Sequence, residues 1–291
     1  MLSFLAAAPH RFDAATIGRT AAFFAGSLVI VVIAKMVRDQ IAARRGHRLP
    51  ELVAKHDNVA VAVEMAGFVL AMVLGLLDSI MVSGIAWWEQ ALDLLTTGAV
   101  VLAVMLLNDQ ITSRVVLRGI DCNLAVVNRN LAVAIVRACA NVASALVTAA
   151  ALGHESPLIE RVIWVLIGQL CLVILSLAYQ KLTPYDDVKE VESQNVAAAL
   201  PMGGILLAVG LVVAAALKGE GAGWGDDLVS LAIDLVVGAV LLFALRWAGD
   251  RFLLPGTTYK EEIARDRNAG AGLIEATSYV AGALAVAYFL S

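Results

Sequence analysis

The sequence is poor in charged residues and lacks the features that mark a soluble enzyme. Only 16% of its 291 residues are Asp, Glu, Lys or Arg, whereas a soluble domain carries about 25%. Its three cysteines (Cys122, Cys139 and Cys171) show no CxxC spacing, which argues against a disulfide framework or a zinc site. There is no HExxH pattern, phosphate-binding loop, GxSxG motif or dinucleotide fingerprint. We therefore expect a protein that is not an enzyme, with no catalytic residue, no metal and no cofactor.

Apolar residues are abundant: 60% of the chain is hydrophobic and the mean hydropathy is +0.84. A helix needs about 20 apolar residues to cross the hydrocarbon core of a membrane. Runs of this kind occur at 17–37, 59–82, 91–108, 131–152, 160–180, 196–217, 227–247 and 269–290. No stretch alternates as a barrel strand does. The expected fold class is all-α, a polytopic membrane helix bundle with eight transmembrane helices.

Lys and Arg residues are distributed unevenly between the connections. Those after the first, third, fifth and seventh runs hold six, three, two and five of them, whereas the N-terminal tail and the remaining connections hold four. Basic connections stay in the cytoplasm, so both termini are expected on the outer or periplasmic side. The basic connections are expected to contact anionic lipid. No aromatic residues interleave with these charges, so a nucleic-acid partner is not expected.

An internal repeat organises the runs. Each even-numbered run follows an Asn, with small residues two, four and eight positions later, an Ala at thirteen and a Leu at sixteen. The copies are NVAVAVEMAGFVLAMVLGL from Asn58, NLAVAIVRACANVASALVT from Asn130, NVAAALPMGGILLAVGLVV from Asn195 and NAGAGLIEATSYVAGALAV from Asn268. The third and seventh runs match each other more weakly. The unit is therefore a helix pair used four times, in two parallel halves, 1–152 and 153–291.

The shared small residues lie on two faces of each even helix. At about 100° per residue, positions 0, 4, 8 and 11 after the Asn share one face, and positions 2, 9, 13 and 16 share the opposite face. Helices in lipid associate by close packing of such residues. We expect the even helices at the centre of a pseudo-fourfold bundle, or of two pseudo-twofold halves. The position-13 alanines should then be buried: Ala71, Ala143, Ala208 and Ala281.

These segments resemble the YjfL-like family of bacterial inner-membrane proteins. The shared features are an N-x-A-x-A segment after a basic connection and a Gly-rich continuation, most clearly in VESQNVAAALPMGGILLAVGLVVAAALKG. The resemblance covers the chain from about residue 20. The family is built from a duplicated domain of unknown function, and its typical members have four helices. The resemblance thus implies a doubled form located in the bacterial inner membrane, and it transfers no functional site.

Several polar residues inside the predicted spans form a candidate site. Glu64, Arg137 and Glu275 follow their repeat Asn by six or seven residues, about 9–11 Å into the membrane. Charges at the bilayer centre cost about 2.5–3.5 kcal/mol, so these should face the bundle. The set is completed by three further residues, Asn141 on the same face as Arg137, and Asp93 and Asp234 from the opposite side.

Two interpretations of this set stay open. In the first interpretation, Arg137 forms a structural salt bridge with one of the glutamates. If Glu275 is that partner, the salt bridge would hold the two halves in register. Alternatively, the leftover carboxylate forms an ion or proton site. The repeat asparagines (Asn58, Asn130, Asn195 and Asn268) likewise either satisfy hydrogen bonds at helix ends and between helices, or ring a cytoplasmic mouth and contact a ligand.

Two functions are therefore compatible with the sequence. One is a small-solute or ion transporter or channel that uses the intramembrane charges. The other is a structural or membrane-stress scaffold that recruits a cytoplasmic protein partner through its basic connections. The lipid bilayer is an expected partner in both cases, and the sequence leaves a homo-oligomer and the substrate open.

Overall fold

The computed structural model describes residues 14–81, 86–153, 156–183, 185–217, 223–252 and 257–290. Within these ranges the regular structure is helical, without strands. The long helices are α1 (Ala14–Arg44), α3 (Val59–Met81), α4 (Trp87–Ile111), α6 (Leu131–Leu152), α7 (Leu158–Leu182), α9 (Val196–Ala216), α10 (Trp224–Phe252) and α11 (Ala269–Leu290). Each contains a segment long and apolar enough to cross a membrane. The predicted all-α fold with eight spans is confirmed.

The repeat asparagines explain why the even-numbered spans α3, α6, α9 and α11 begin where the sequence predicts. Each Asn caps its helix, as when the side-chain oxygen of Asn130 accepts a hydrogen bond from the backbone N–H of Val133 at 3.1 Å. The odd spans lack this signal and run longer than predicted. α4 begins at Trp87 and continues into the π-helix η2 (Thr112–Val116), so Asp93 lies in its second turn.

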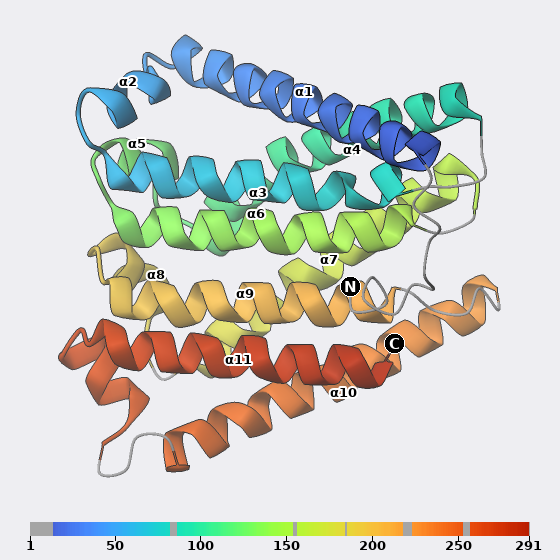
Figure 1. Ribbon diagram of the computed structural model, residues 1–291. Helices are drawn as coiled ribbons and strands as arrows, with labels where there is room; N and C mark the ends of the chain where they lie inside the picture. The colour runs from blue at the N-terminus through green and yellow to red at the C-terminus, as the bar shows by residue number, and fades with distance from the viewer. Residues whose placement is uncertain are drawn as a thin grey trace.

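Short helices precede the even spans and gather at one end of the molecule (Figure 1). They are α2 (Leu49–Ala54), α5 (Cys122–Val127), α8 (Asp187–Glu192) and the π-helix η3 (Glu261–Arg265). We call this end, formed by α2, α5, α8 and η3, the connector end. Its short helices link each odd span to the even span that follows.

The same sharp turn joins each short helix to its even span. The residue before every repeat Asn has a left-handed backbone, with φ between 48° and 68°: Asp57, Arg129, Gln194 and Arg267. The next backbone N–H closes the short helix, as from Asn130 to the carbonyl of Ala125. Glycine usually occupies such a position. One of the residues found here, Arg129, donates a hydrogen bond from its guanidinium to the carbonyl of His56 in the preceding repeat, at 2.6 Å.

The even spans lie side by side in the order α3, α6, α9, α11 (Figure 1). Among the odd spans, α4 packs against α3 and α6, α7 against α6 and α9, and α10 against α9 and α11. α1 packs against α3. This arrangement is a row of repeats and not the pseudo-fourfold bundle, which was one of the two expected arrangements. Two opposed small-residue faces allow packing to continue in line without closing into a ring.

Small residues bring neighbouring even spans to backbone distance. A Cβ added to Gly204 of α9 would lie 2.6 Å from Cα of Ala276 in α11. A Cβ added to Gly210 of α9 would lie 2.7 Å from Cβ of Ala143 in α6. Real Cβ atoms do not approach so closely, so these contacts depend on glycine.

The burial of each position-13 alanine depends on where its helix lies in the row. Ala71, Ala143 and Ala208 are fully buried, as expected. Ala281 is exposed, which corrects the prediction for this copy. The reason is that α11 lies at the end of the row, and within the described ranges no other even span packs on that face.

Candidate functional site

Four buried charged residues meet inside the first half. Oε1 of Glu64 on α3 lies 2.8 Å from the guanidinium of Arg38 on α1 and 2.8 Å from that of Arg137 on α6. Arg137 also approaches Asp109 of α4 at 3.2 Å. None of these residues is more than 9% exposed. Two cations therefore face two anions, and a desolvated cluster of this kind is tolerated because its charges are paired.

Amides extend this charge cluster along α4 and α6. Asn108 donates to Oδ1 of Asn141 at 2.8 Å, and Asn141 donates to Oδ1 of Asp109 at 3.4 Å. Arg137 donates a further hydrogen bond to Asn123 of α5 at 3.2 Å. The polar groups thus connect three elements of the first half into one network.

The structure brings together three residues of the predicted site: Glu64, Arg137 and Asn141. The salt bridge of Arg137 forms with Glu64, inside one half, so it does not join the halves. At the far end of the spans, Asp93 lies 3.7 Å from Arg161. Asp234 is half-buried on α10.

Arg38, Asp109 and Asn108 are members of the cluster that sequence reasoning missed. The predicted first span ended at residue 37, which left Arg38 among the basic connections. In the structure α1 continues to Arg44, and the guanidinium of Arg38 lies 5.0 Å from the ring centroid of Phe68. Phe68 lies on another helix, so its contact with Arg38 leaves no local signal in the sequence. The charged residues at the margins of the predicted spans could have been tested as members of the cluster.

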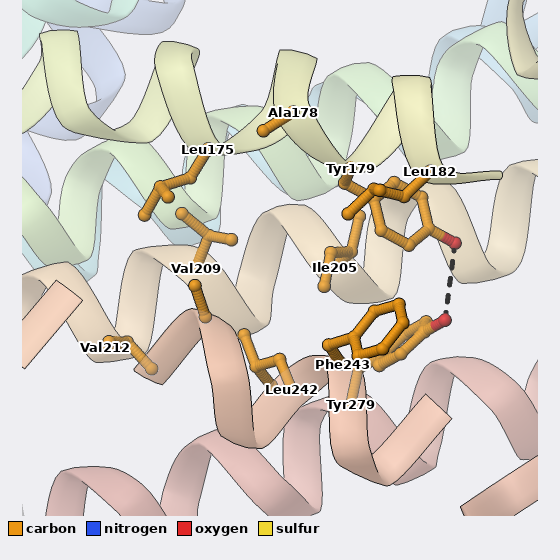
Figure 2. Close-up of a pocket in the computed structure, with 11 residues that line it drawn as sticks. Leu175, Ala178, Tyr179, Leu182, Ile205, Val209, Val212, Leu242, Phe243 and Tyr279 are labelled. Atoms are coloured by element: carbon orange, nitrogen blue, oxygen red, sulfur yellow. Dashed lines mark hydrogen bonds between the residues drawn. The ribbon is translucent and has the colours of Figure 1, made fainter. Parts of the chain in front are cut away.

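The corresponding region of the second half holds an apolar pocket of about 80 Å³. It lies between α7, α9, α10 and α11, the counterparts of the four helices around the charge cluster. Figure 2 shows apolar side chains from three of these helices around it, including Leu175, Val209 and Phe243. The hydroxyls of Tyr179 and Tyr279 face each other at one edge, 3.5 Å apart.

Glu275 belongs to this second region. The hydroxyl of Tyr279 donates to Oε1 of Glu275 at 2.6 Å, and Glu275 is only 1% exposed. Position seven of the repeat is Arg137 in the first half and Glu275 in the second, and position eleven is Asn141 or Tyr279. The halves therefore use the same helical positions for two different chemistries.

Each buried repeat asparagine ties its repeat to the next. The amide nitrogen of Asn58 donates to the carbonyl of Val127 at 2.9 Å, and that of Asn130 to the carbonyl of Val191 at 3.1 Å. Asn195 donates to the carbonyl of Ile263 at 2.9 Å. Asn268, in the last repeat, is exposed and donates to its own neighbour Glu262. One of the three buried asparagines thus lies at each junction between successive repeats.

No group of three or more His, Cys, Asp or Glu that could hold a metal ion occurs within the described ranges. The charge cluster of the first half offers ion pairs and amides, and the region of the second half offers a carboxylate that is hydrogen-bonded to a tyrosine.

The fold and these two regions define a multi-pass membrane-type protein, built from four helix-pair repeats arranged in a row. The family model named Domain of Unknown Function (DUF350) matches residues 12–152 and again residues 154–290. The chain therefore belongs to this family and carries its domain twice, which confirms the expected resemblance to a duplicated domain of unknown function. Searches of curated proteins and of solved structures found no match.

Proposed function

We propose that this protein is a scaffold of a bacterial inner membrane whose connector end faces the cytoplasm and binds an acidic protein there. The observation that carries the proposal is the charge of the connector end in the first half. Residues 44–57 and 112–129 hold seven Lys or Arg against three Asp or Glu. Such a patch attracts acidic partners, and its effect is strongest at low salt.

The ion pairs and hydrogen bonds of the first half support this role. Helices α1, α3, α4 and α6 are linked through the charge cluster, in which every ionised group has an oppositely charged neighbour. The repeat asparagines hold the short helices against the row. A surface fixed in this way presents its charges without paying a large ordering entropy on binding.

Two matched variants test the scaffold. Arg45→Gln with Arg48→Gln removes two exposed charges from the first half, and Lys189→Gln with Lys260→Gln removes two exposed charges from the second. The full-length protein in nanodiscs is used to capture cytoplasmic proteins at low and physiological salt. The first pair should abolish capture of a salt-sensitive acidic partner, and the second should leave it intact. Equal loss in both pairs, or no salt-sensitive partner, would contradict the proposal.

Ion or proton transport is a second candidate, favoured by the deep burial of Glu64 and Asp109 beside the Asn108–Asn141 amide pair. It is tested by reconstituting the protein in liposomes and measuring proton and cation flux. Glu64→Gln and Glu275→Gln should reduce flux, whereas Asp78→Asn, at an exposed site on α3, should not. Flux unchanged by the two glutamate variants would exclude them from the path.

A further inference from the structure

We propose that copies of this protein assemble head to tail in the membrane, with α11 of one copy seated against α3 of the next. The occupant of both exposed end faces is thus a second copy of the same chain. The inference does not depend on the scaffold proposal, because it concerns contacts between copies of this chain and not the binding of a cytoplasmic protein.

The same junction already occurs three times within the chain. Counting each repeat Asn as zero, position nine of one even span meets position eight of the next. The pairs are Gly67 with Ala138, Cys139 with Gly203, and Gly204 with Ala276. Positions two and four meet as Ala197 and Gly272, and positions 13 and 15 meet as Ala143 and Gly210. We call positions 2, 9, 13 and 16 the forward face and positions 4, 8, 12 and 15 the backward face.

The two ends of the row expose one face of each kind. The forward face of α11 is exposed at all four positions: Gly270, Thr277, Ala281 and Leu284. The backward face of α3 is exposed at Ala66 and Leu70, and half-buried at Ala62 and Val73. Lipid chains cover such shallow faces less closely than a matching helix does, because close packing drives helix association in membranes.

Applied to these ends, the internal contact rule pairs Gly270 with Ala62, Thr277 with Ala66, and Ala281 with Val73. Every internal pair described above contains a glycine, and the Thr277–Ala66 pair does not. Copies should therefore sit slightly further apart than the repeats within one chain. The contact is correspondingly weaker, as suits an interface formed between chains that fold separately.

The connector end provides a matching hydrogen-bond site. Asn58 and Asn130 donate to carbonyls three and four residues before the next repeat Asn. The same spacing directs Asn268 to the carbonyls of Lys55 and Ala54 of the following copy, which belong to exposed residues. In the structure, the amide of Asn268 donates to Glu262 of its own repeat.

Within the part of the chain that the structure describes, the packing of the odd spans also leaves one end of the row without a neighbour. Helices α4, α7 and α10 each pack against two even spans, whereas α1 packs against α3 as its even partner. Its outer side exposes apolar residues, among them Leu28, Val32 and Met36. In the assembly, α1 would lie between its own α3 and the α11 of the preceding copy, as α4 lies between α3 and α6.

Charge at the connector end favours the same order. The first half is basic there, whereas residues 185–194 and 257–267 of the second half hold four Lys or Arg against seven Asp or Glu. Head-to-tail assembly alternates basic and acidic halves. A twofold arrangement would instead bring like halves together at the new junction, which costs energy. The interface is therefore heterologous and generates a ring or an open row.

Disulfide cross-linking in native membranes tests the interface. In a chain with Cys122, Cys139 and Cys171 replaced by Ala, Thr277→Cys is combined with Ala66→Cys. Oxidation should give a ladder of dimers, trimers and larger species. Either single variant should stay monomeric, and co-expression of the two single variants should give only dimers. Dimers of a single variant would indicate a twofold contact and overturn the proposal.

Two control pairs make a negative result decisive. Thr277→Cys with Leu95→Cys carries the same number of thiols, with the second on an exposed apolar site of α4, and should give no ladder. Ala71→Cys with Ala145→Cys occupies positions 13 and 15 of an internal junction and should lose both free thiols on oxidation. If the internal pair oxidises and the Thr277–Ala66 pair does not, head-to-tail assembly is excluded.

Assembly is also measured without cysteines, from the mass of the protein in nanodiscs excised from native membranes. Ala281→Trp and Ala66→Trp add bulk at exposed sites, so both should fold and shift the particles to single copies. Leu95→Trp should leave the distribution of the parent protein unchanged. A parent protein that is already monomeric, or oligomers that persist in both alanine variants, would overturn the proposal.

Discussion

Arg137 of α6 and Glu64 of α3 lie 2.8 Å apart in an interior where neither side chain is more than 5% exposed. Glu64 is also the partner of Arg38, so one carboxylate holds two guanidiniums from two other helices. Glu64 is thus the centre of the charge cluster. Removing it leaves a buried cation with no neutralising neighbour, which costs more than the intact pair contributes.

Glu64→Gln is therefore expected to destabilise the protein by about 3–5 kcal/mol, the range for breaking a buried ion pair. Combining it with Arg38→Gln restores the balance of charge and should recover part of the loss. Thermal unfolding of the purified protein in detergent measures both. The exposed control Asp78→Asn should change stability by less than about 0.5 kcal/mol. A single variant as stable as its parent would show that the cluster is not a structural centre.

Gly204→Ala is expected to destabilise the α9–α11 contact. The new Cβ would lie 2.6 Å from Cα of Ala276, so the helices must separate, at a cost of about 1–3 kcal/mol. Gly18→Ala is the matched control, because no atom lies within 4 Å of a Cβ there. It should be neutral, or stabilising by up to about 1 kcal/mol through helix propensity. Unfolding midpoints that fall equally in both variants would contradict this packing.

Asn130→Ala should cost more than Asn268→Ala. Both variants lose a helix cap worth about 1 kcal/mol. Asn130→Ala also leaves the buried carbonyl of Val191 without its amide and removes a part-buried hydrogen bond to the carbonyl of Glu192, which adds about 1–3 kcal/mol. The comparison is made by chemical denaturation of dispersed single copies in detergent. Equal losses would mean that the amide does not tie one repeat to the next.

Tyr279→Phe should destabilise the second half by about 1–3 kcal/mol, because Glu275 loses the hydroxyl that donates to it at 2.6 Å. Glu275→Gln keeps an oxygen that accepts this bond, so its effect should be smaller. Thermal unfolding monitored in the same detergent ranks the two variants. The reverse order would indicate that the negative charge of Glu275 matters more than the hydrogen bond.

The orientation in the membrane is tested by labelling thiols from one side. In the cysteine-free chain, Arg45→Cys should react with a membrane-impermeant maleimide only from the cytoplasm, and Trp88→Cys only from the periplasm. Both sites are exposed, at opposite ends of the spans. The three native thiols are absent from this chain, so only the introduced cysteine can react with the maleimide. Labelling with the opposite sidedness would invert the proposed topology.

The sequence predicted the features of the fold that are encoded locally. The starts of α3, α6, α9 and α11 follow from an Asn that caps the helix, and apolar length gave the number of spans. Position within the repeat also placed Glu64 and Arg137 near each other in depth. Their direct pairing required the lateral order of the helices, which depends on how the small-residue faces meet.

The row could not be distinguished from a bundle by the repeat alone. Two opposed faces on each helix are compatible with a line or with closure, because the pattern fixes which sides pack and not the angle between successive units. Arg38 was missed for a related reason. Helix α1 continues seven residues beyond the predicted boundary at residue 37, to Arg44, because the length of an apolar run does not mark where a helix ends.

The contrast between the two halves follows from their covalent connection. A half-length chain that pairs with an identical copy must place the same side chains on both sides of every junction. Duplication within a single chain removes this constraint, since each half can change without altering the other. Here one half has an ionic interior and the other has an apolar pocket beside a tyrosine pair, so every molecule carries one of each in a fixed ratio.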